Sequence, residues 1–149
     1  DQRGVIYGDN RIAKLTHRVL QCQGFDKVEL LPPEANNSLQ PNYYDYVIET
    51  LADEVTMQQL TEAVKPRGLI ILKSRSSGSV PMPLSLIVKK QIRLVGAHYG
   101  DFQRGIDLLA SGRLKVQDLF GECLPLDCAV DILSGKVSVD EQKKIFFVP

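Results

Sequence analysis

The sequence predicts an α/β fold: a truncated, doubly wound and mainly parallel sheet with helices on both faces. Residues 43–72 provide the first observation, because an aromatic and β-branched run, apolar residues at helical spacing and an aliphatic run follow one another. That order is typical of two parallel strands joined by a helix. The second observation is that such segments alternate along the rest of the chain. The third is that residues 32–43 are too few to hold a further helix and strand. We therefore expect one thin flank, meaning that one side of the sheet lacks a helix and a strand.

The other elements follow from apolar periodicity and from residues that begin or end helices. Asp53 and Asp101 are expected helix N-caps, and we expect helices to end at Gly24, Gly68, Gly112 and Gly135. Strands are expected at 4–8, 27–31, 44–50, 69–72, 91–97 and 144–148, and helices at 12–23, 52–65, 84–90, 101–111 and 126–133. This gives five or six strands in the sheet.

Composition excludes several classes of partner. The chain has 149 residues, which suits one domain spanning 1–149 with a C-terminal strand segment at about 136–149. Its 18 basic and 18 acidic residues balance, so no electrostatic argument favours nucleic acid. No apolar run has the length of a membrane span, and no signal-peptide pattern precedes the first strand, so a cytoplasmic protein is expected.

The cysteines and the first residue support two further expectations. Cys123 and Cys128 have no second pair and no nearby histidine, so no zinc site is expected in this chain. Because the sequence starts at Asp1 without methionine, we expect a fragment or one domain of a longer protein.

The turn after the first strand lies where a Rossmann-like sheet binds the phosphates of a nucleotide. Its G-x-G-x-x-G window reads Gly8-Asp9-Asn10-Arg11-Ile12-Ala13. Asn10 replaces the second glycine and is expected to stand where a pyrophosphate needs bare backbone. Asp9 adds negative charge, which Arg11 partly offsets. The carboxylate expected after the second strand is also missing there, since the nearest is Glu34. Dinucleotide binding and a scaffold kept for its shape both remain open.

The second half of the chain resembles the cofactor domain of medium-chain dehydrogenases and reductases, the alcohol dehydrogenase and quinone reductase superfamily. The resemblance is a series of pieces in order, at 44–50, 64–72, 83–97, 101–114, 125–136 and 146–149. Within the series, Ala110-Ser111-Gly112-Arg113-Leu114 looks like the family's "ASG-K/R-L" turn. Residues 1–43 match only in outline.

The resemblance implies a domain that binds NAD or NADP and passes hydride to a carbonyl or an enone. In that family the catalytic groups come mainly from a separate N-terminal domain, and we expect these 149 residues to hold only the cofactor domain. We therefore expect that this chain alone is not a competent enzyme, that its partner is a catalytic domain outside it, and that its catalytic residues stay unassigned. The family also pairs the strand matching Ile92–Ala97 edge to edge, which implies a homodimer.

Cofactor contacts are expected at the carboxyl ends of the strands. The candidates are Gly8, Asp9, Asn10, Arg11, Ile12, Thr50, Leu51, Ser74, Arg75 and His98. Thr50 and Ser74 are expected to donate hydrogen bonds near the nicotinamide ribose. His98 is a proton-donor candidate. For each of these three residues, the alternative is an ordinary solvated loop residue.

Three functions compete. The first is the cofactor domain of an oxidoreductase. The second is a non-catalytic, dehydrogenase-like interaction or structural module that has lost cofactor binding, which Asn10 favours. The third is an S-adenosylmethionine-dependent methyltransferase, whose later motifs Asp45 to Glu49 and Lys65 to Gly68 also resemble. An antiparallel strand at the edge of the sheet would favour the third.

Overall fold

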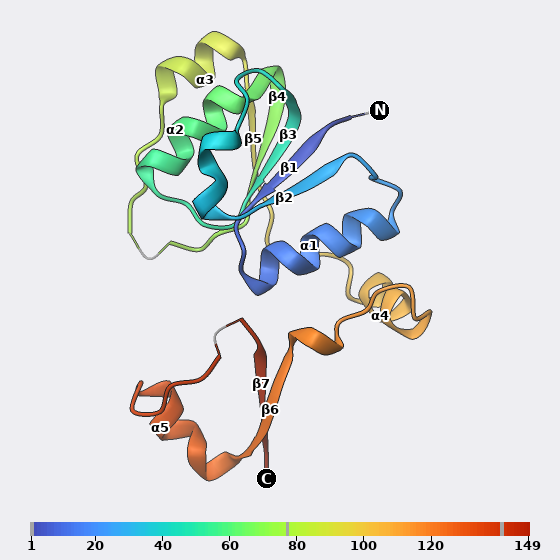
Figure 1. Cartoon of the computed structure of the whole chain (residues 1–149). Coiled ribbons are helices and arrows are strands. Elements are labelled where there is room, and N and C mark those ends of the chain that lie inside the picture. The colour runs from blue at the N-terminus through green and yellow to red at the C-terminus, as the bar shows by residue number, and fades with distance from the viewer. Residues whose placement is uncertain (1, 77, 141) are drawn as a thin grey trace.

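The computed structural model describes residues 2–76, 78–140 and 142–149, without the side chains of residues 36 and 37. Five strands form one sheet in the order β2-β1-β3-β4-β5, and every neighbouring pair is parallel. The strands are β1 (Gly4–Tyr7), β2 (Val28–Leu31), β3 (Tyr44–Glu49), β4 (Val64–Leu72) and β5 (Arg93–Gly96). This confirms the predicted parallel sheet (Figure 1).

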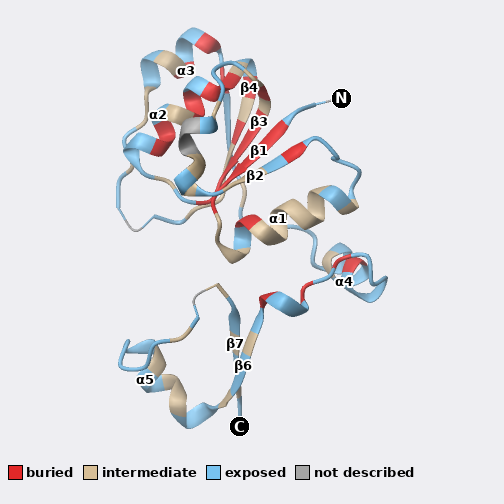
Figure 2. Ribbon diagram, viewed as in Figure 1, coloured by how far each residue is buried: buried red, intermediate tan, exposed pale blue. Residues whose placement is uncertain are grey.

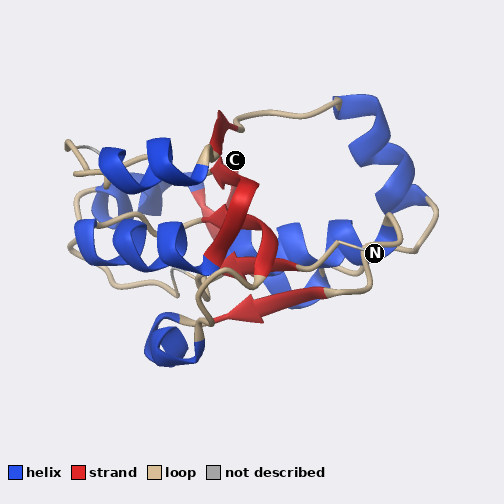
Figure 3. Ribbon diagram, turned by 90° about the horizontal axis from the view of Figure 1, so that it is seen from above, coloured by secondary structure: helices blue, strands red, loops and turns tan. Residues whose placement is uncertain are grey.

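Helices cover both faces of this sheet, as predicted (Figure 3). Helix α1 (Arg11–Cys22) packs on one face, where Ala13 and Leu20 meet Ile6 and Ile48. Helices α2 (Glu54–Ala63) and α3 (Leu84–Lys90) pack on the other. The core of that face consists of aliphatic and aromatic side chains from both layers, including Val5, Val47, Met57, Leu60, Ile70 and Ile87.

The thin flank lies at β2, which is an edge strand. A short 3-10 segment, η1 (Pro33–Ser38), leads from β2 directly to β3, which pairs with β1. The chain therefore crosses from one half of the sheet to the other without a further helix and strand. The truncation predicted from residues 32–43 is confirmed.

Most of the predicted helix ends are confirmed. Asp53 and Asp101 accept hydrogen bonds from the backbone N–H of Thr56 and Arg104, at 2.7 and 3.1 Å. After the helices, positive φ angles of 85°, 67° and 74° occur at Gly24, Gly112 and Gly135, where a residue without Cβ avoids strain.

The prediction that Gly68 ends a helix is wrong. Helix α2 ends at Ala63, and β4 begins at the next residue, so Gly68 lies within the strand. The positive φ of 62° belongs to Arg67. Gly68 is required for another reason, because a Cβ there would lie 2.7 Å from a methyl group of Val64 and 2.9 Å from the carbonyl oxygen of Asp45.

Residues 120–149 form a separate C-terminal unit (Figure 1). The strands β6 (Phe120–Pro125) and β7 (Lys144–Val148) make a second, two-stranded parallel sheet. The short segments η3 (Leu126–Cys128) and α5 (Ala129–Leu133) connect them. The predicted final strand is thus confirmed, but it lies outside the five-stranded sheet, and its partner β6 was not predicted. No described residue of this unit is buried (Figure 2).

Helix α1 packs against the segment that leads to the C-terminal unit. Arg18 forms a two-pronged ion pair with Asp118, at 2.7 and 2.6 Å. Behind it, Leu15 and Val19 pack against a small cluster formed by Leu108, Leu114 and Val116, of which Leu108 belongs to α4 (Phe102–Ala110). None of the described helices is both long and apolar enough to cross a membrane.

Candidate functional site

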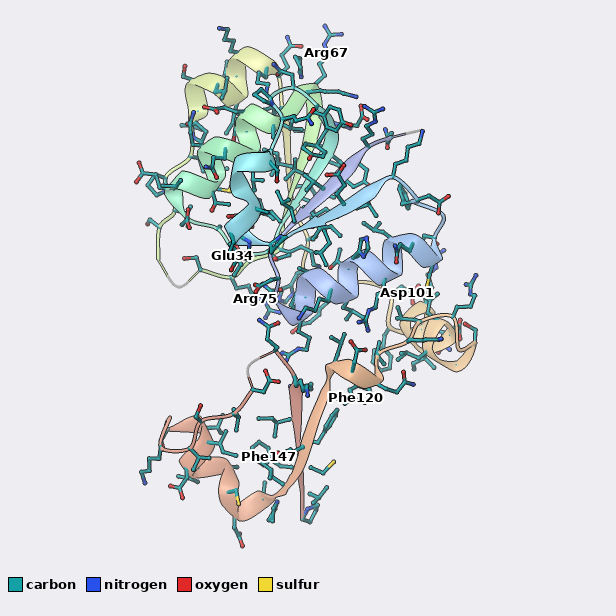
Figure 4. The ribbon with its side chains drawn as sticks, viewed as in Figure 1. Glu34, Arg67, Arg75, Asp101, Phe120 and Phe147 are labelled. Carbon is teal, nitrogen blue, oxygen red and sulfur yellow. The ribbon has the colours of Figure 1, made fainter. Side chains whose placement is uncertain are left out.

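A pocket of about 540 Å³ lies at the carboxyl edge of the sheet, where β3, β4 and β5 end and α1 begins. Figure 4 places Arg75 at this edge. The lining residues come from four segments, and they are Ile12, Thr50, Leu51, Ala52, Lys73, Ser74, Arg75, Ser76, Ala97, His98 and Tyr99. In parallel α/β sheets, ligands bind outside the carboxyl ends of the strands, so this is the first place to look for function.

The pocket brings together six of the ten predicted site residues, namely Ile12, Thr50, Leu51, Ser74, Arg75 and His98. The other four, Gly8, Asp9, Asn10 and Arg11, are absent from its lining. The predicted phosphate turn and the predicted strand ends are therefore separated: the strand ends form the pocket, and the turn lies beside it.

Asn10 joins the turn to the end of β3. Its side-chain oxygen accepts a hydrogen bond from the backbone N–H of Ala13 at 2.9 Å, so it caps α1. Its side-chain nitrogen donates to the carbonyl and hydroxyl oxygens of Thr50, at 3.1 and 3.2 Å. Both ends of the amide are bonded within the protein, and one N–H of the helix N-terminus is no longer available to an anion.

Gly8 is required at the end of β1. Its φ is 132°, and a Cβ built there would lie 2.1 Å from the hydroxyl oxygen of Thr50. The glycine therefore allows the turn to approach β3 closely. The first position of the glycine motif is retained for this packing between strands.

Arg11 does not serve the predicted phosphate site. Its guanidinium donates to the carbonyl oxygen of Lys143 at 2.8 Å, next to the start of β7. Arg11 lines a different groove, mostly apolar, between α1, α4 and the C-terminal unit. The expected charge compensation of Asp9 by Arg11 is therefore not found in the pocket.

Two of the hydroxyl groups that line the pocket point their hydrogens into the protein. Thr50 donates to the carbonyl oxygen of Tyr7 at 2.8 Å, and Ser74 donates to a carboxylate oxygen of Glu49 at 2.9 Å. A hydroxyl has one hydrogen and two acceptor lone pairs. In this structure Thr50 and Ser74 therefore offer acceptors to the pocket, whereas the sequence predicted donors.

Glu49 was missed as a site residue. It ends β3, is 0% exposed, and has Tyr7 and Leu72 as its strand partners. Burial raises the pKa of its carboxyl above the ordinary value, although the Ser74 hydroxyl and nearby backbone N–H groups act in the opposite direction. The sequence feature that could have identified Glu49 is an acidic residue directly after the apolar run Tyr46 to Ile48.

Positive charge and aromatic rings lie on the β4 and β5 side of the pocket. The guanidinium of Arg75 lies 5.8 Å from the ring centroid of Tyr99, and the rings of Tyr99 and His98 have centroids 3.9 Å apart. Lys73 adds a second cation to the lining. Cationic side chains at this edge suit an anionic group such as a phosphate.

The described part of the chain contains no group of three or more His, Cys, Asp or Glu side chains arranged to hold a metal ion. The three cysteines are free thiols, and Cys22 donates to the carbonyl oxygen of Arg113 at 3.3 Å. The expectation of no zinc in this chain stays a prediction.

No family model matches the chain, and no curated protein matches it. Solved structures do match. A Sinorhizobium meliloti protein described as a zinc-binding dehydrogenase, bound to NADP, has a TM-score of 0.80 at 20% identity, covering 99% of this chain and 52% of that one. The 2R,3R-butanediol dehydrogenase of Bacillus subtilis gives 0.77 at 14% identity, with 99% and 51% covered. An Escherichia coli protein described as a short chain alcohol dehydrogenase, complexed with NADH, gives 0.77 at 15%, with 100% and 52% covered.

The chain has a Rossmann-like fold. This confirms the predicted fold class, and identities of 14–20% establish the fold alone. The Rossmann-like chain spans about half the length of these dehydrogenases.

Proposed function

We propose that this chain is the cofactor domain of a medium-chain, alcohol dehydrogenase-like oxidoreductase, and that its carboxyl-edge pocket binds NAD or NADP. The main observation in support is the pocket, which is lined by residues that follow β3, β4 and β5 and by the first turn of α1. Its volume of about 540 Å³ lies in the range of small-molecule sites. Two dehydrogenases of the same fold were solved with NADP and with NADH.

The residues of the pocket fit the nicotinamide half of a dinucleotide better than the adenosine half. Lys73 and Arg75 would hold phosphate oxygens, and Thr50 and Ser74 would accept hydrogen bonds from hydroxyl or amide groups. On the other side, Asn10 occupies the phosphate turn. When bound, the cofactor would supply the hydride, and the protein would supply orientation and electrostatics.

The reacting groups would come from outside this chain. His98 is the one histidine among the lining residues, and it is exposed. We propose a separate catalytic domain that closes over the pocket, because the chain spans only half the length of the dehydrogenases that it matches.

A homodimer through β5 is part of this proposal. β5 is an edge strand that pairs only with β4 in the described sheet, so one side of its backbone remains available for another strand. Leu94 and Val95 are 37% and 49% exposed there. Sedimentation equilibrium should detect the dimer, and a strict monomer at high concentration would contradict this part.

The second candidate function is a non-catalytic module that has lost cofactor binding. The amide of Asn10 favours it, because both of its ends are bonded inside the phosphate turn. A methyltransferase has less support, since all strand pairs of the described sheets are parallel and the antiparallel edge strand that would favour it is not among them.

A titration of the chain with NADH and NADPH tests the first function, with thermal shift and nicotinamide fluorescence as readouts. Arg75→Ala should weaken binding by roughly tenfold, the value of one charge-assisted hydrogen bond. Arg93→Ala is the matched control, because Arg93 is exposed on β5 outside the pocket. Saturable binding that only Arg75→Ala weakens supports the cofactor domain, and absence of binding supports the module.

A further inference from the structure

Glu49 is a buried carboxyl beneath the pocket with no cationic partner among the described residues. Its side chain is 0% exposed, and none of the described ion pairs includes it. Burying a carboxyl without a counter-charge is costly. Buried carboxyls next to clefts are candidates for functional sites.

Both hydrogen bonds that the Glu49 carboxyl accepts go to the same one of its two oxygens. Oε2 accepts from the Ser74 hydroxyl at 2.9 Å and is 3.4 Å from the Ser74 backbone nitrogen, which also donates to it. Oε1 is buried and has no hydrogen-bond partner within the described chain. A proton on the carboxyl would therefore reside on Oε1, because Oε2 already accepts two hydrogens. The Ser74 hydroxyl points its hydrogen at Glu49 in either protonation state.

The hydroxyl hydrogen of Thr50, like that of Ser74, is used in a hydrogen bond within the protein. Its hydroxyl donates to the carbonyl oxygen of Tyr7 and accepts from Asn10, which leaves one lone pair. Ser74 and Thr50 both line the pocket. Its two internally bonded hydroxyls thus act as acceptors, and its strong donors are the cations Lys73 and Arg75.

We propose that Glu49 is a positioning residue that fixes the Ser74 hydroxyl as a hydrogen-bond acceptor for the ligand. The ligand must then present a donor at Ser74, either a sugar hydroxyl or a primary amide, and an anionic group to Lys73 and Arg75. A ribose or amide joined to a phosphate has this chemistry. The identity of the ligand rests on the proposed function, whereas the polarity of the pocket follows from Glu49 and Ser74 themselves.

Four variants and one small probe test the proposal. The probe is reduced nicotinamide mononucleotide, which carries an amide, ribose hydroxyls and a single phosphate. Glu49→Gln keeps an oxygen acceptor for both donors of Ser74, so its affinity should stay within about twofold of wild type. Glu49→Met and Ser74→Ala should each weaken binding by about three- to tenfold, the value of one hydrogen bond. Ser85→Ala is the matched control and should leave affinity unchanged, since Ser85 is exposed on α3 and does not line the pocket.

The double variant Glu49→Met/Ser74→Ala separates positioning from a structural role. If Glu49 acts through Ser74, the double variant should bind no more weakly than either single variant. The melting temperature of each variant checks that it is folded, since Glu49→Met removes a buried carboxyl but also leaves the Ser74 hydroxyl and N–H without their acceptor. A residue with a merely structural role would leave the two effects on affinity additive.

The outcomes distinguish this proposal from the proposed function. Unchanged affinity in Glu49→Met, additive effects in the double variant, or no binding of the mononucleotide to wild type would each overturn the positioning role, even if NADH binds. If the mononucleotide binds with the expected dependence but neither NADH nor NADPH does, the positioning role stands and the dinucleotide function fails.

Discussion

The side-chain nitrogen of Asn10 lies 3.1 Å from the carbonyl oxygen of Thr50 and 3.2 Å from its hydroxyl oxygen, and donates to both. This bond fastens the turn between β1 and α1 to the end of β3. The same side chain caps α1 through the N–H of Ala13. One residue thus stabilises the scaffold at the place where a nucleotide-binding turn would have a second glycine.

Asn10→Gly should therefore lower the stability of the protein and raise its affinity for the cofactor. The variant loses the cap and the two bonds to Thr50, and we expect the free energy of unfolding to fall by about 2 kcal/mol. It also exposes the backbone of the turn, so NADH and NADPH should bind more tightly. Asn10→Ser is the control, because serine can retain the cap but is too short to reach Thr50. Chemical denaturation and a cofactor titration measure both effects, and unchanged affinity in Asn10→Gly would contradict the account of the turn.

Gly8→Ala should be strongly destabilising. The new Cβ would meet the Thr50 hydroxyl at 2.1 Å, and φ at this position is 132°. We expect a loss of about 2–3 kcal/mol from strain and displacement of Thr50. Gly78→Ala is the matched control, since nothing lies within 4 Å of a Cβ there. Equal midpoints of urea unfolding for the two variants would show that the close approach at Gly8 is not required.

Lys90 should contribute more stability than its neighbour Lys89. Its buried ammonium donates to the carbonyl oxygens of Thr61 and Glu62 at the end of α2, at 2.7 and 2.8 Å. Burial lowers its pKa, whereas the negative charge of Glu62 acts in the opposite direction. Lys90→Met should cost about 2 kcal/mol because it leaves both carbonyls without this donor. The exposed Lys89→Met should change the unfolding free energy by less than about 0.5 kcal/mol, and similar losses for the two would refute the assigned role of Lys90.

The stability of the protein should depend on pH through Glu49. Burial raises the pKa of this carboxyl in the folded state above its unfolded value. The folded protein therefore holds the proton more tightly, and its contribution is fully present below the unfolded pKa and lost as pH rises through the folded pKa. Glu49→Gln removes this titration. The free energy of unfolding of the variant minus that of wild type should increase from acidic to neutral pH, and a difference that stays constant with pH would contradict a raised pKa.

The sheet was predictable because its signals are local. The aliphatic run Leu69–Leu72 and the apolar stripe of α2 follow from periodicity, and Asp53 and Asp101 cap the helices as their positions indicate. The thin flank could be predicted from the length of residues 32–43 alone. The prediction that a helix ends at Gly68 was wrong because glycine occurs in several conformations. Here a glycine is needed because a side chain would collide with Val64 and with the backbone of Asp45.

The chemistry of the site depends on contacts between distant residues, which one sequence does not show. Strand ends predicted Thr50, Ser74 and Arg75 correctly as neighbours, since parallel strands end at one edge. The direction of their hydroxyl hydrogens depends on Tyr7 and Glu49, and no local pattern encodes it. In the same way, Arg11 contacts the carbonyl of Lys143, which lies 132 residues further along the chain. The strand β6 was missed because its residues are only exposed or half-buried, so its sequence has neither an apolar run nor a regular alternation.

The most direct test of the central claim is a fluorescence titration of the wild-type chain with NADH and NADPH, followed in parallel by melting temperature. The pocket at the carboxyl edge should bind one nicotinamide dinucleotide saturably and raise the melting temperature as the site fills. If the melting temperature of the folded chain does not change at millimolar NADH or NADPH, cofactor binding is contradicted. The Rossmann-like domain would then act as an interaction or structural module and not in hydride transfer.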